Sequence, residues 1–359
     1  MRAKCKNAEL KFKSMNIKNY EINDKSDCFV IAEIGNNHQG NLEVCKKMFK
    51  AAKECGVDAV KLQKRDNRFL YTKSFYDSAY SSENAYGPTY GLHREALEFG
   101  EAEYQELKKY AEELGLIFFA TAFDFRSADF LAEMDMPCFK IASGDLTNIP
   151  LLKYVASFGK PMIISSGAAT MEDVERAYNA IALTNKNIAL LQCTATYPTD
   201  PAYLDLAVIN TYKNKFPETV IGLSDHYNGI ALGLVAFTLG ARIIEKHFTL
   251  DRTMRGTDHA FSLEPVGMKK LVRDLKRARL AMGDGNKKIY EEERSARKKM
   301  GKKIVVARNL PEGHVLGEAD LAFKSPGDGL PPYYAESFYG KTLKRALNEE
   351  DDLNFDCVI

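Results

Sequence analysis

Residues 28–63 read CFVIAEIGNNHQGNLEVCKKMFKAAKECGVDAVKLQ, and they contain one complete strand–helix–strand unit. The runs 28–34 and 58–63 are short and mostly apolar, as buried strands are. Between them, residues 42–55 place apolar side chains at helical spacing and stop before Gly56, a residue that suits the left-handed cap of a helix. Because two parallel strands need a crossover connection, this unit predicts a parallel sheet.

The same alternation continues along the chain. Six further apolar runs predict strands at 116–121, 137–143, 161–166, 188–194, 219–225 and 241–248. Segments with helical spacing of apolar residues lie among and after them, at 102–114, 171–183, 230–239 and 268–282. Eight such strands within roughly 250 residues predict an α/β fold of the closed (β/α)8 type, a TIM barrel. An open doubly wound sheet is the alternative, but no GxGxxG follows the first strand, which weakens its dinucleotide-binding form.

After residue 283 the sequence loses the regular pattern of strands and amphipathic helices. We therefore predict a barrel domain at 24–283, a linker at 284–300 and a small, mostly β domain at 301–359, where short apolar pairs are punctuated by Pro and Gly. A module of about 60 residues is near the lower limit for independent folding, so we expect it to lean on the barrel or on a second chain.

Composition excludes several classes of protein. The 359 residues are 45% hydrophobic and carry 50 Lys plus Arg against 49 Asp plus Glu, which argues against a disordered chain and against a general nucleic-acid binder. The seven cysteines form no CxxC pair and predict reduced thiols in the cytoplasm. Residues 1–27 lack the apolar region of a secretory signal, and glycines break the uncharged stretch 227–241, so no membrane association is expected.

Polar residues stand at nearly every predicted strand end, where TIM barrels carry their chemistry. In chain order they are Glu33, Lys61, Gln63, Thr121, Lys140, Ser143, Asp145, Ser165, Ser166, Cys193, Thr194, Ser224, Asp225, His226, Glu245 and His247, with Tyr197 just beyond the sixth strand. Burying an unpaired charge is costly, so Lys61 and Lys140 indicate a ligand. Lysines with hydroxyls suit a small substrate that carries carboxylate and phosphate, although any single serine can instead cap a helix.

His226 and His247 follow neighbouring predicted strands and could bind one metal ion. Two imidazoles leave most coordination positions open, which favours Mn²⁺ or Mg²⁺ over a closed zinc site. The alternative is a pair of core histidines hydrogen-bonded to carbonyl groups.

Several motifs together resemble those of the N-acetylneuraminate (sialic acid) synthase family. They are AEIGNNHQG (32–40), VKLQK (60–64), FKIASGD (139–145), ISSGA (164–168), QCTATYP (192–198), GLSDH (222–226) and EKHFTLD (245–251). The carboxyl-terminal segment VVARNLPEGHVL resembles the antifreeze-like SAF domain that this family appends to its barrel. The resemblance runs from about Phe29 to the end of the chain.

The resemblance implies a metal-dependent condensation of phosphoenolpyruvate with an N-acylated aminohexose, N-acetylmannosamine or its 6-phosphate. The products would be a nonulosonic (sialic) acid, or its 9-phosphate, and phosphate. It also implies a domain-swapped homodimer. The site residues it implies are Glu33 and Asp145 for catalysis; Lys61, Thr121, Lys140, Ser143, Ser165 and Ser166 for phosphoenolpyruvate; Gln63, Tyr197 and Asp258 for the sugar; and His226 and His247 for Mn²⁺ or Mg²⁺.

The chain departs from the family pattern at a few places. It has Asp145 where bacterial members often have Glu, Ala195 where they have Asn, and Ser325 where a KRPG motif has the arginine that reaches the partner's barrel. The loop 66–98 is expected to cover the sugar and looks closest to animal-type members, which use the 6-phosphate. Cations that could meet this phosphate are Arg65, Arg68, Lys73, His93 and Arg94.

Two other functions remain open at this point. The same chemistry could use another acceptor sugar, as in synthases of related nonulosonic acids. The other alternative is a non-catalytic binding protein with an antifreeze-like module. The polar and charged residues at the strand ends argue against it.

Overall fold

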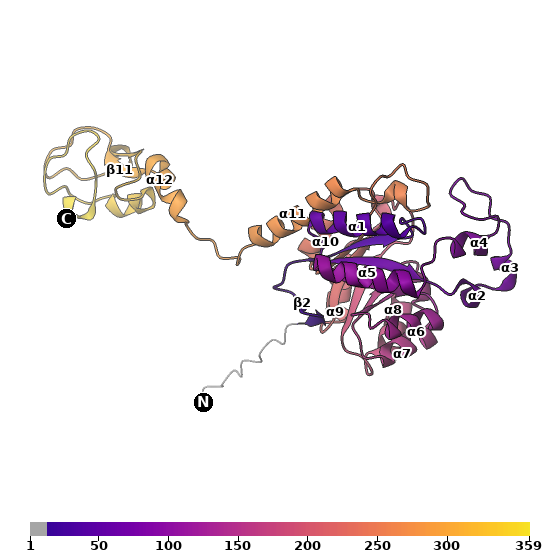
Figure 1. Cartoon of the computed structure of the whole chain (residues 1–359). Coiled ribbons are helices and arrows are strands. Elements are labelled where there is room, and N and C mark those ends of the chain that lie inside the picture. Colours follow the sequence, from indigo (N-terminus) through magenta and orange to yellow (C-terminus); the bar gives the residue numbers. More distant parts are fainter. Residues whose placement is uncertain (1–12) are drawn as a thin grey trace, which may run out of the picture. The chain divides into compact units, whose positions relative to one another are not determined.

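The structure of the protein is a computed structural model that describes residues 13–359 (Figure 1). The chain divides between Met282 and Gly283 into two compact units. In the first unit, parallel strands close into a barrel in the order β10-β3-β4-β5-β6-β7-β8-β9. The TIM barrel predicted from the sequence is therefore confirmed.

Each barrel strand corresponds to one predicted apolar run. The strands are β3 (Phe29–Gly35), β4 (Ala59–Lys64), β5 (Ile117–Ala122), β6 (Phe139–Ile141), β7 (Met162–Ser165), β8 (Ile188–Cys193), β9 (Val220–Asp225) and β10 (Ile243–His247). The helices that follow the strands around the barrel are α1 (Leu42–Cys55), α5 (Glu101–Leu114), α6 (Phe125–Glu133), α7 (Ile149–Ser157), α8 (Met171–Ile181), α9 (Val208–Lys215), α10 (Ala231–Leu239) and α11 (Pro265–Ala281).

Side chains alternate between the two faces of each strand, so one set fills the barrel interior and the other packs against the helices. The amino-terminal half of the interior is apolar, with Phe29, Ile31, Phe119, Ile163 and Ile243 in one buried cluster. Gly222 on β9 leaves room in this layer. A Cβ there would lie 2.4 Å from Leu191 Cδ2 and 2.5 Å from the Ile243 carbonyl oxygen.

A β-hairpin precedes the barrel and was not predicted. Its strands β1 (Ser14–Ile17) and β2 (Tyr20–Asn23) are antiparallel and place Met15, Ile17 and Ile22 in the apolar interior cluster. The predicted barrel domain, 24–283, therefore omits residues that contribute to the barrel core. Two four-residue strands with polar residues between the apolar ones give too short a pattern to be recognised.

A long excursion separates β4 from α5. It contains the short helices α2 (Asn67–Leu70), α3 (Lys73–Tyr76) and α4 (Tyr90–Glu95), which begin at the caps Asp66, Thr72 and Thr89. The cap side chains accept hydrogen bonds from backbone N–H groups of the first turn, which orders helices too short to be stable alone. Figure 1 shows these helices beyond the end of the barrel opposite to β2.

The second unit contains α12 (Glu291–Met300) and a two-stranded antiparallel sheet, β11 (Lys303–Val306) with β12 (Leu321–Lys324). Short 3-10 turns and isolated bridges surround a core of Ile304, Val306, Phe338 and Leu353, among others. This arrangement fits the small, mostly β domain predicted.

Helix α12 lies inside residues 284–300, which the sequence analysis interpreted as a linker. Three glutamates occupy its first turn and Arg297, Lys298 and Lys299 its last, so its charges complement the helix dipole. An ion pair joins Arg294 to Glu291 at 2.7 Å. The helix was missed because no residue of it is buried, which leaves no apolar periodicity to detect. Among the described residues, no helix has the length and apolar character needed to cross a membrane.

Candidate active site

A cavity of about 320 Å³ opens at the carboxyl ends of the barrel strands. Eleven of the site residues predicted from the sequence line it: Glu33, Lys61, Gln63, Thr121, Lys140, Ser143, Ser165, Tyr197, His226, His247 and Asp258. Register explains why most of them meet, since Glu33 pairs with Lys61 on one side and with His247 on the other. Thr121 likewise lies opposite both Gln63 and Lys140.

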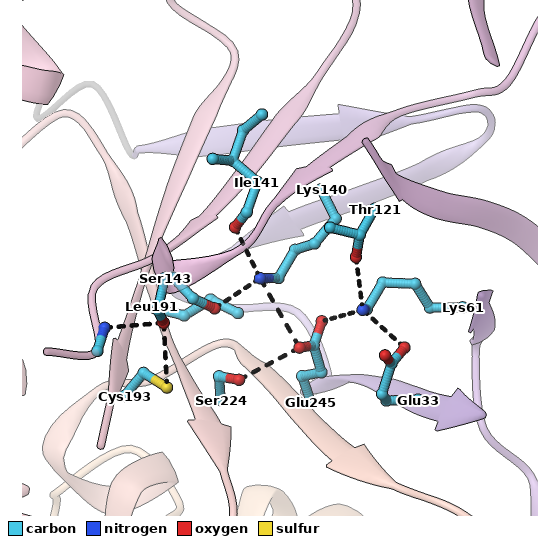
Figure 2. Close-up of polar contacts among 12 residues, drawn as sticks. Glu33, Lys61, Thr121, Lys140, Ile141, Ser143, Leu191, Cys193, Ser224 and Glu245 are labelled. Carbon is cyan, nitrogen blue, oxygen red and sulfur yellow. Dashed lines mark hydrogen bonds and ion pairs between the residues drawn. The ribbon is translucent and has the colours of Figure 1, made fainter. Parts of the chain in front are cut away.

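Lys61 forms one half of the charged floor of this cavity. Its Nζ lies 2.6 Å from Glu33 Oε2 and donates a hydrogen bond to Thr121 Oγ1 at 2.9 Å (Figure 2). Gln63 Nε2 donates to the other oxygen of Glu33 at 2.7 Å. Lys61 and Glu33 are 3% and 2% exposed, so this ion pair is shielded from water.

Lys140 forms the other half. Its Nζ donates to Ser165 Oγ at 2.6 Å and to the Ile141 carbonyl oxygen at 2.9 Å. Glu245 lies between the two lysines, 3.8 Å from each Nζ, and accepts a hydrogen bond from Ser224 Oγ at 3.2 Å (Figure 2). Two ammonium groups thus converge on one carboxylate inside the barrel mouth.

Burial changes the pKa values of these groups. It raises the pKa of Glu33 above the usual range, although the charge of Lys61 opposes the shift. It lowers the pKa of Lys140, against the attraction of Glu245. Burial would also raise the pKa of Glu245, but the charges of Lys140 and Lys61 outweigh it and hold that pKa low. Shifted pKa values at a cluster of converging groups are typical of a functional site.

His226 and His247 lie side by side at the carboxyl ends of β9 and β10, with ring centroids 5.4 Å apart. His226 Nδ1 donates to the Thr194 carbonyl oxygen at 2.9 Å, which leaves the lone pair on Nε2. Burial and the neighbouring His247 lower the pKa of His226 to about 4, so this ring is a neutral imidazole at neutral pH. His247 Nδ1 is buried without a hydrogen-bond partner, and Asp258 Oδ2 is 3.8 Å away.

These observations fit a divalent cation. The neutral imidazole of His226 and the His247 imidazole, which has an orphaned buried nitrogen, are donors that Mn²⁺ or Mg²⁺ can share with water and substrate oxygens. Within residues 13–359, no group of three or more His, Cys, Asp or Glu side chains is arranged to hold a metal ion. The donor set is therefore an open one, not the closed tetrahedron of a structural zinc site.

Two predicted site residues do not line the cavity. Ser166 follows Ser165 and points the other way, where its Oγ donates to the Leu191 carbonyl oxygen and accepts from the Tyr212 hydroxyl. Asp145 ends a 3-10 turn after β6 and accepts a hydrogen bond from Asn148 Nδ2 at 3.3 Å. The structure gives these two side chains local partners.

Other residues line the cavity without having been assigned a role from the sequence. Glu245 and Ser224 are the most central, and both precede a predicted metal ligand by two residues on its strand or strand end. Both were noted among the polar strand-end residues, and the period of two along a strand, which places them on the same inward face as the histidines, was the signal that could have given them a role. Of the cations considered for a sugar phosphate, Arg65 and Arg94 line the cavity, and Arg68, Lys73 and His93 do not.

Comparison with known proteins agrees with this architecture. A model of the NeuB family matches residues 48–287, and a model of the SAF domain matches residues 303–352. The chain belongs to the NeuB family. The synthase family and the SAF domain inferred from the motifs are thereby confirmed.

Relatives of this NeuB family member cover most of the chain. Human N-acetylneuraminate-9-phosphate synthase is 39% identical over 333 residues, which are 92% of this chain and 93% of the human protein. N,N'-diacetyllegionaminic acid synthase of Legionella pneumophila is 35% identical over 329 residues, 89% and 92% of the two chains. The N-acetylneuraminic acid (sialic acid) synthetase structure from Leptospira borgpetersenii, in complex with citrate, has a TM-score of 0.70 at 32% identity and covers 79% of this chain and 95% of its own. The protein is thus an enzyme of the N-acetylneuraminate synthase type, as the motifs predict.

Proposed function

We propose that this NeuB family member condenses phosphoenolpyruvate with the open-chain aldehyde of an N-acylated aminohexose to give a nonulosonic acid and phosphate. The observation that carries this proposal is the pair of buried ammonium groups, Lys61 and Lys140, converging beside Glu33 and Glu245 at the barrel mouth. Each buried ion loses hydration worth roughly several kcal/mol. We therefore expect such an arrangement to be retained only where a ligand uses it.

The proposed reaction forms one carbon–carbon bond and replaces the carbon–oxygen bond to phosphate by one to the oxygen of water. The methylene carbon of phosphoenolpyruvate attacks the aldehyde carbon of the sugar, the aldehyde oxygen takes up a proton, and water adds to the former enol carbon. The bond from that carbon to the phosphate oxygen then breaks, the hydroxyl group left on the carbon loses its proton to become the keto group, and phosphate leaves. Relatives named as synthases of N-acetylneuraminate-9-phosphate and of N,N'-diacetyllegionaminic acid support this chemistry.

Residues of the chain can supply the remaining functions. Lys61 and Lys140, with the hydroxyl groups of Thr121 and Ser165, provide donors for the phosphate and carboxylate of phosphoenolpyruvate. Glu33 is buried and has a raised pKa, which suits it to take a proton from the attacking water and return one. Gln63 and Lys61 hold its carboxylate in place.

We also propose that the site takes a divalent cation, Mn²⁺ or Mg²⁺, at His226 and His247. When bound, such an ion would act as a Lewis acid toward the aldehyde oxygen. The neutral ring of His226 described above, and the unpartnered His247 Nδ1, support this assignment.

Phosphate release tests the proposed function. Protein supplied with Mn²⁺ and phosphoenolpyruvate is expected to release phosphate only when an acceptor aldose is added, and a panel of N-acylated aminohexoses and their 6-phosphates identifies the acceptor. Full activity in the presence of a strong chelator, or no activity with any acceptor, would contradict the proposal. The domain-swapped homodimer stays a prediction, which the molar mass in solution checks.

A further inference from the structure

A buried ion pair lies directly behind the two histidines, outside the cavity. It joins Lys246 of β10 to Asp225 of β9, with 2.8 Å between Nζ and Oδ2, and the two residues are 1% and 2% exposed. The residues just before and just after each of them line the cavity, whereas the pair itself does not. Because side chains alternate along a strand, the pair points away from the cavity and toward the layer of helices.

The surroundings of this pair are apolar. Ile244 and Phe248, two residues to either side of Lys246, are 0% exposed and belong to the large hydrophobic cluster of the barrel. Leu223, two residues before Asp225, belongs to the same cluster. Replacing a buried ion pair by apolar side chains of similar volume is often neutral or stabilising, because two ions no longer lose their hydration. Stability alone therefore gives no reason for an ion pair at this position.

The contacts of the pair converge on the backbone of Tyr227. Asp225 Oδ1 accepts a hydrogen bond from the Tyr227 N–H at 2.8 Å, and Lys246 Nζ donates to the Tyr227 carbonyl oxygen. His226 lies between Asp225, which carries the carboxylate, and Tyr227, whose two backbone groups are held. The ion pair thus fixes the chain on both sides of His226.

His226 needs this support more than His247 does. His247 is the last residue of β10 and is still in register with β3. The ladder between β9 and β10 ends at Asp225 and Lys246, so His226 lies one residue beyond it. Thr199 N donates to the His226 carbonyl oxygen at 3.1 Å from the other side. The place of His226 is therefore set by a turn that the ion pair closes, and not by the sheet.

We propose that Asp225 and Lys246 are positioning residues, which hold the backbone of His226 so that its Nε2 and the His247 ring can bind one divalent cation. This inference rests on the cation proposed at the two histidines and assigns what prepares them for it. A ligand that is held in place beforehand loses less conformational freedom on binding. Removing the outer partners of metal ligands typically lowers metal affinity about 10- to 100-fold.

Binding of Mn²⁺ alone tests the proposal without turnover. The whole chain is stripped of metal with a chelator, dialysed and titrated with Mn²⁺, and electron paramagnetic resonance of the free ion gives the Kd. The double variant Asp225→Asn/Lys246→Met removes one charge of each sign, so the net charge is unchanged and no buried ion is left unpaired. We expect its Kd to be about 10- to 100-fold higher than that of the wild type.

Two further variants separate positioning from stability. Met15→Ala removes a side chain from the apolar interior cluster, so it weakens the fold without a contact to the histidines, and its Kd should stay within about twofold of the wild type. Asp225→Asn alone keeps an oxygen for the Tyr227 N–H but loses the charge opposite Lys246, and its Kd should rise at least about threefold. This single variant carries the test if the double variant does not fold.

The possible results are distinct. Equal Mn²⁺ affinity in the wild type and the variants of the pair would overturn the positioning role and leave the cation site standing. An equal loss of affinity in Met15→Ala would also overturn it, because general destabilisation would then explain the effect. If the wild-type protein binds no Mn²⁺, the cation proposed at His226 and His247 is rejected, and the positioning role with it.

Discussion

The two halves of the barrel interior are built from the same strands and differ in almost every property. Toward the amino-terminal ends the strands present Ala59, Ile163 and Ile243, which the β1–β2 hairpin covers with further apolar side chains. One pleat further along, the same strands present Lys61, Ser165 and Glu245. A shift of two residues thus separates a core that stabilises the fold from a charged site that does not.

The difference teaches where stability and function are located in this molecule. In the amino-terminal half of the barrel interior, each Å² of apolar surface removed from water stabilises the fold by about 25 cal/mol. Groups such as Lys140 and Glu33 instead have pKa values displaced against their charged forms by burial. Substitutions in the amino-terminal half should therefore change stability, and substitutions at the carboxyl ends of the strands, the mouth of the barrel, should change activity.

The largest effect is expected at Glu33. Glu33→Gln removes the carboxylate but keeps a side chain that can accept from Gln63. We expect kcat to fall about 10²- to 10⁴-fold, as for loss of a general acid–base, with the free energy of unfolding changed by less than about 1 kcal/mol. Phosphate release and chemical denaturation measure the two quantities on one preparation. A loss of kcat below tenfold would remove Glu33 from the proposed role.

The opposite pattern is expected for the hairpin. Met15 is 0% exposed inside the apolar cluster, so Met15→Ala should lower the free energy of unfolding by about 2–5 kcal/mol. The kcat of the folded fraction should stay within about twofold of the wild type. Val266→Ala, at a position 67% exposed on α11, is the matched control and should cost less than about 0.5 kcal/mol. A selective loss of kcat in Met15→Ala would break the comparison.

Part of the pH dependence of stability should arise at the amino-terminal end of the barrel. Burial raises the pKa of Asp58, at the start of β4, from 3.8 to about 6, although its carboxylate accepts from Val30 N at 2.8 Å. A raised pKa stabilises the fold below the unfolded pKa, and this contribution is lost as pH rises through about 6. Asp58→Asn should therefore gain stability relative to the wild type by roughly 1–3 kcal/mol between pH 4 and pH 7. Denaturation at both pH values checks this, and a constant or declining difference would contradict it.

A smaller effect is expected at Thr121. Thr121→Val keeps the shape of the side chain but removes the oxygen that accepts from Lys61 at 2.9 Å. We expect kcat/KM for phosphoenolpyruvate to fall about 5- to 10-fold, the effect of one hydrogen bond of about 1 kcal/mol. Thr238→Val on the exposed side of α10 should leave kcat/KM unchanged. Equal losses in the two variants would assign the effect to general destabilisation.

Much of the barrel could be predicted because its strands are continuous apolar runs, and because several of the helices between them end at a glycine cap. The hairpin could not, since Met15, Ile17 and Ile22 alternate with polar residues over only four positions per strand. Helix α12 could not either, because its ends are set by charge and capping and not by an apolar stripe.

The site was predictable to the extent that strand ends converge. Motif resemblance named Ser165 and Ser166 together, but the period of two sends only Ser165 into the cavity. Glu245 was visible on the inward face of its strand, yet its position between two lysines depends on the closure of the barrel. Arg65 and Arg94 both line the cavity because of the path of the α2–α4 excursion, which no local pattern specifies.

Lys140 tests most directly the claim that the mouth of the barrel is maintained for a ligand and not for the fold. In Lys140→Met, Glu245 keeps Lys61 at 3.8 Å and the Ser224 hydroxyl, so the substitution leaves no carboxylate without a partner. Calorimetric titration of phosphoenolpyruvate and chemical denaturation should be performed on the same preparation. We predict affinity lower by about 10- to 100-fold with an equal or higher free energy of unfolding. Unchanged affinity, or a fold destabilised by more than about 2 kcal/mol, would contradict the claim.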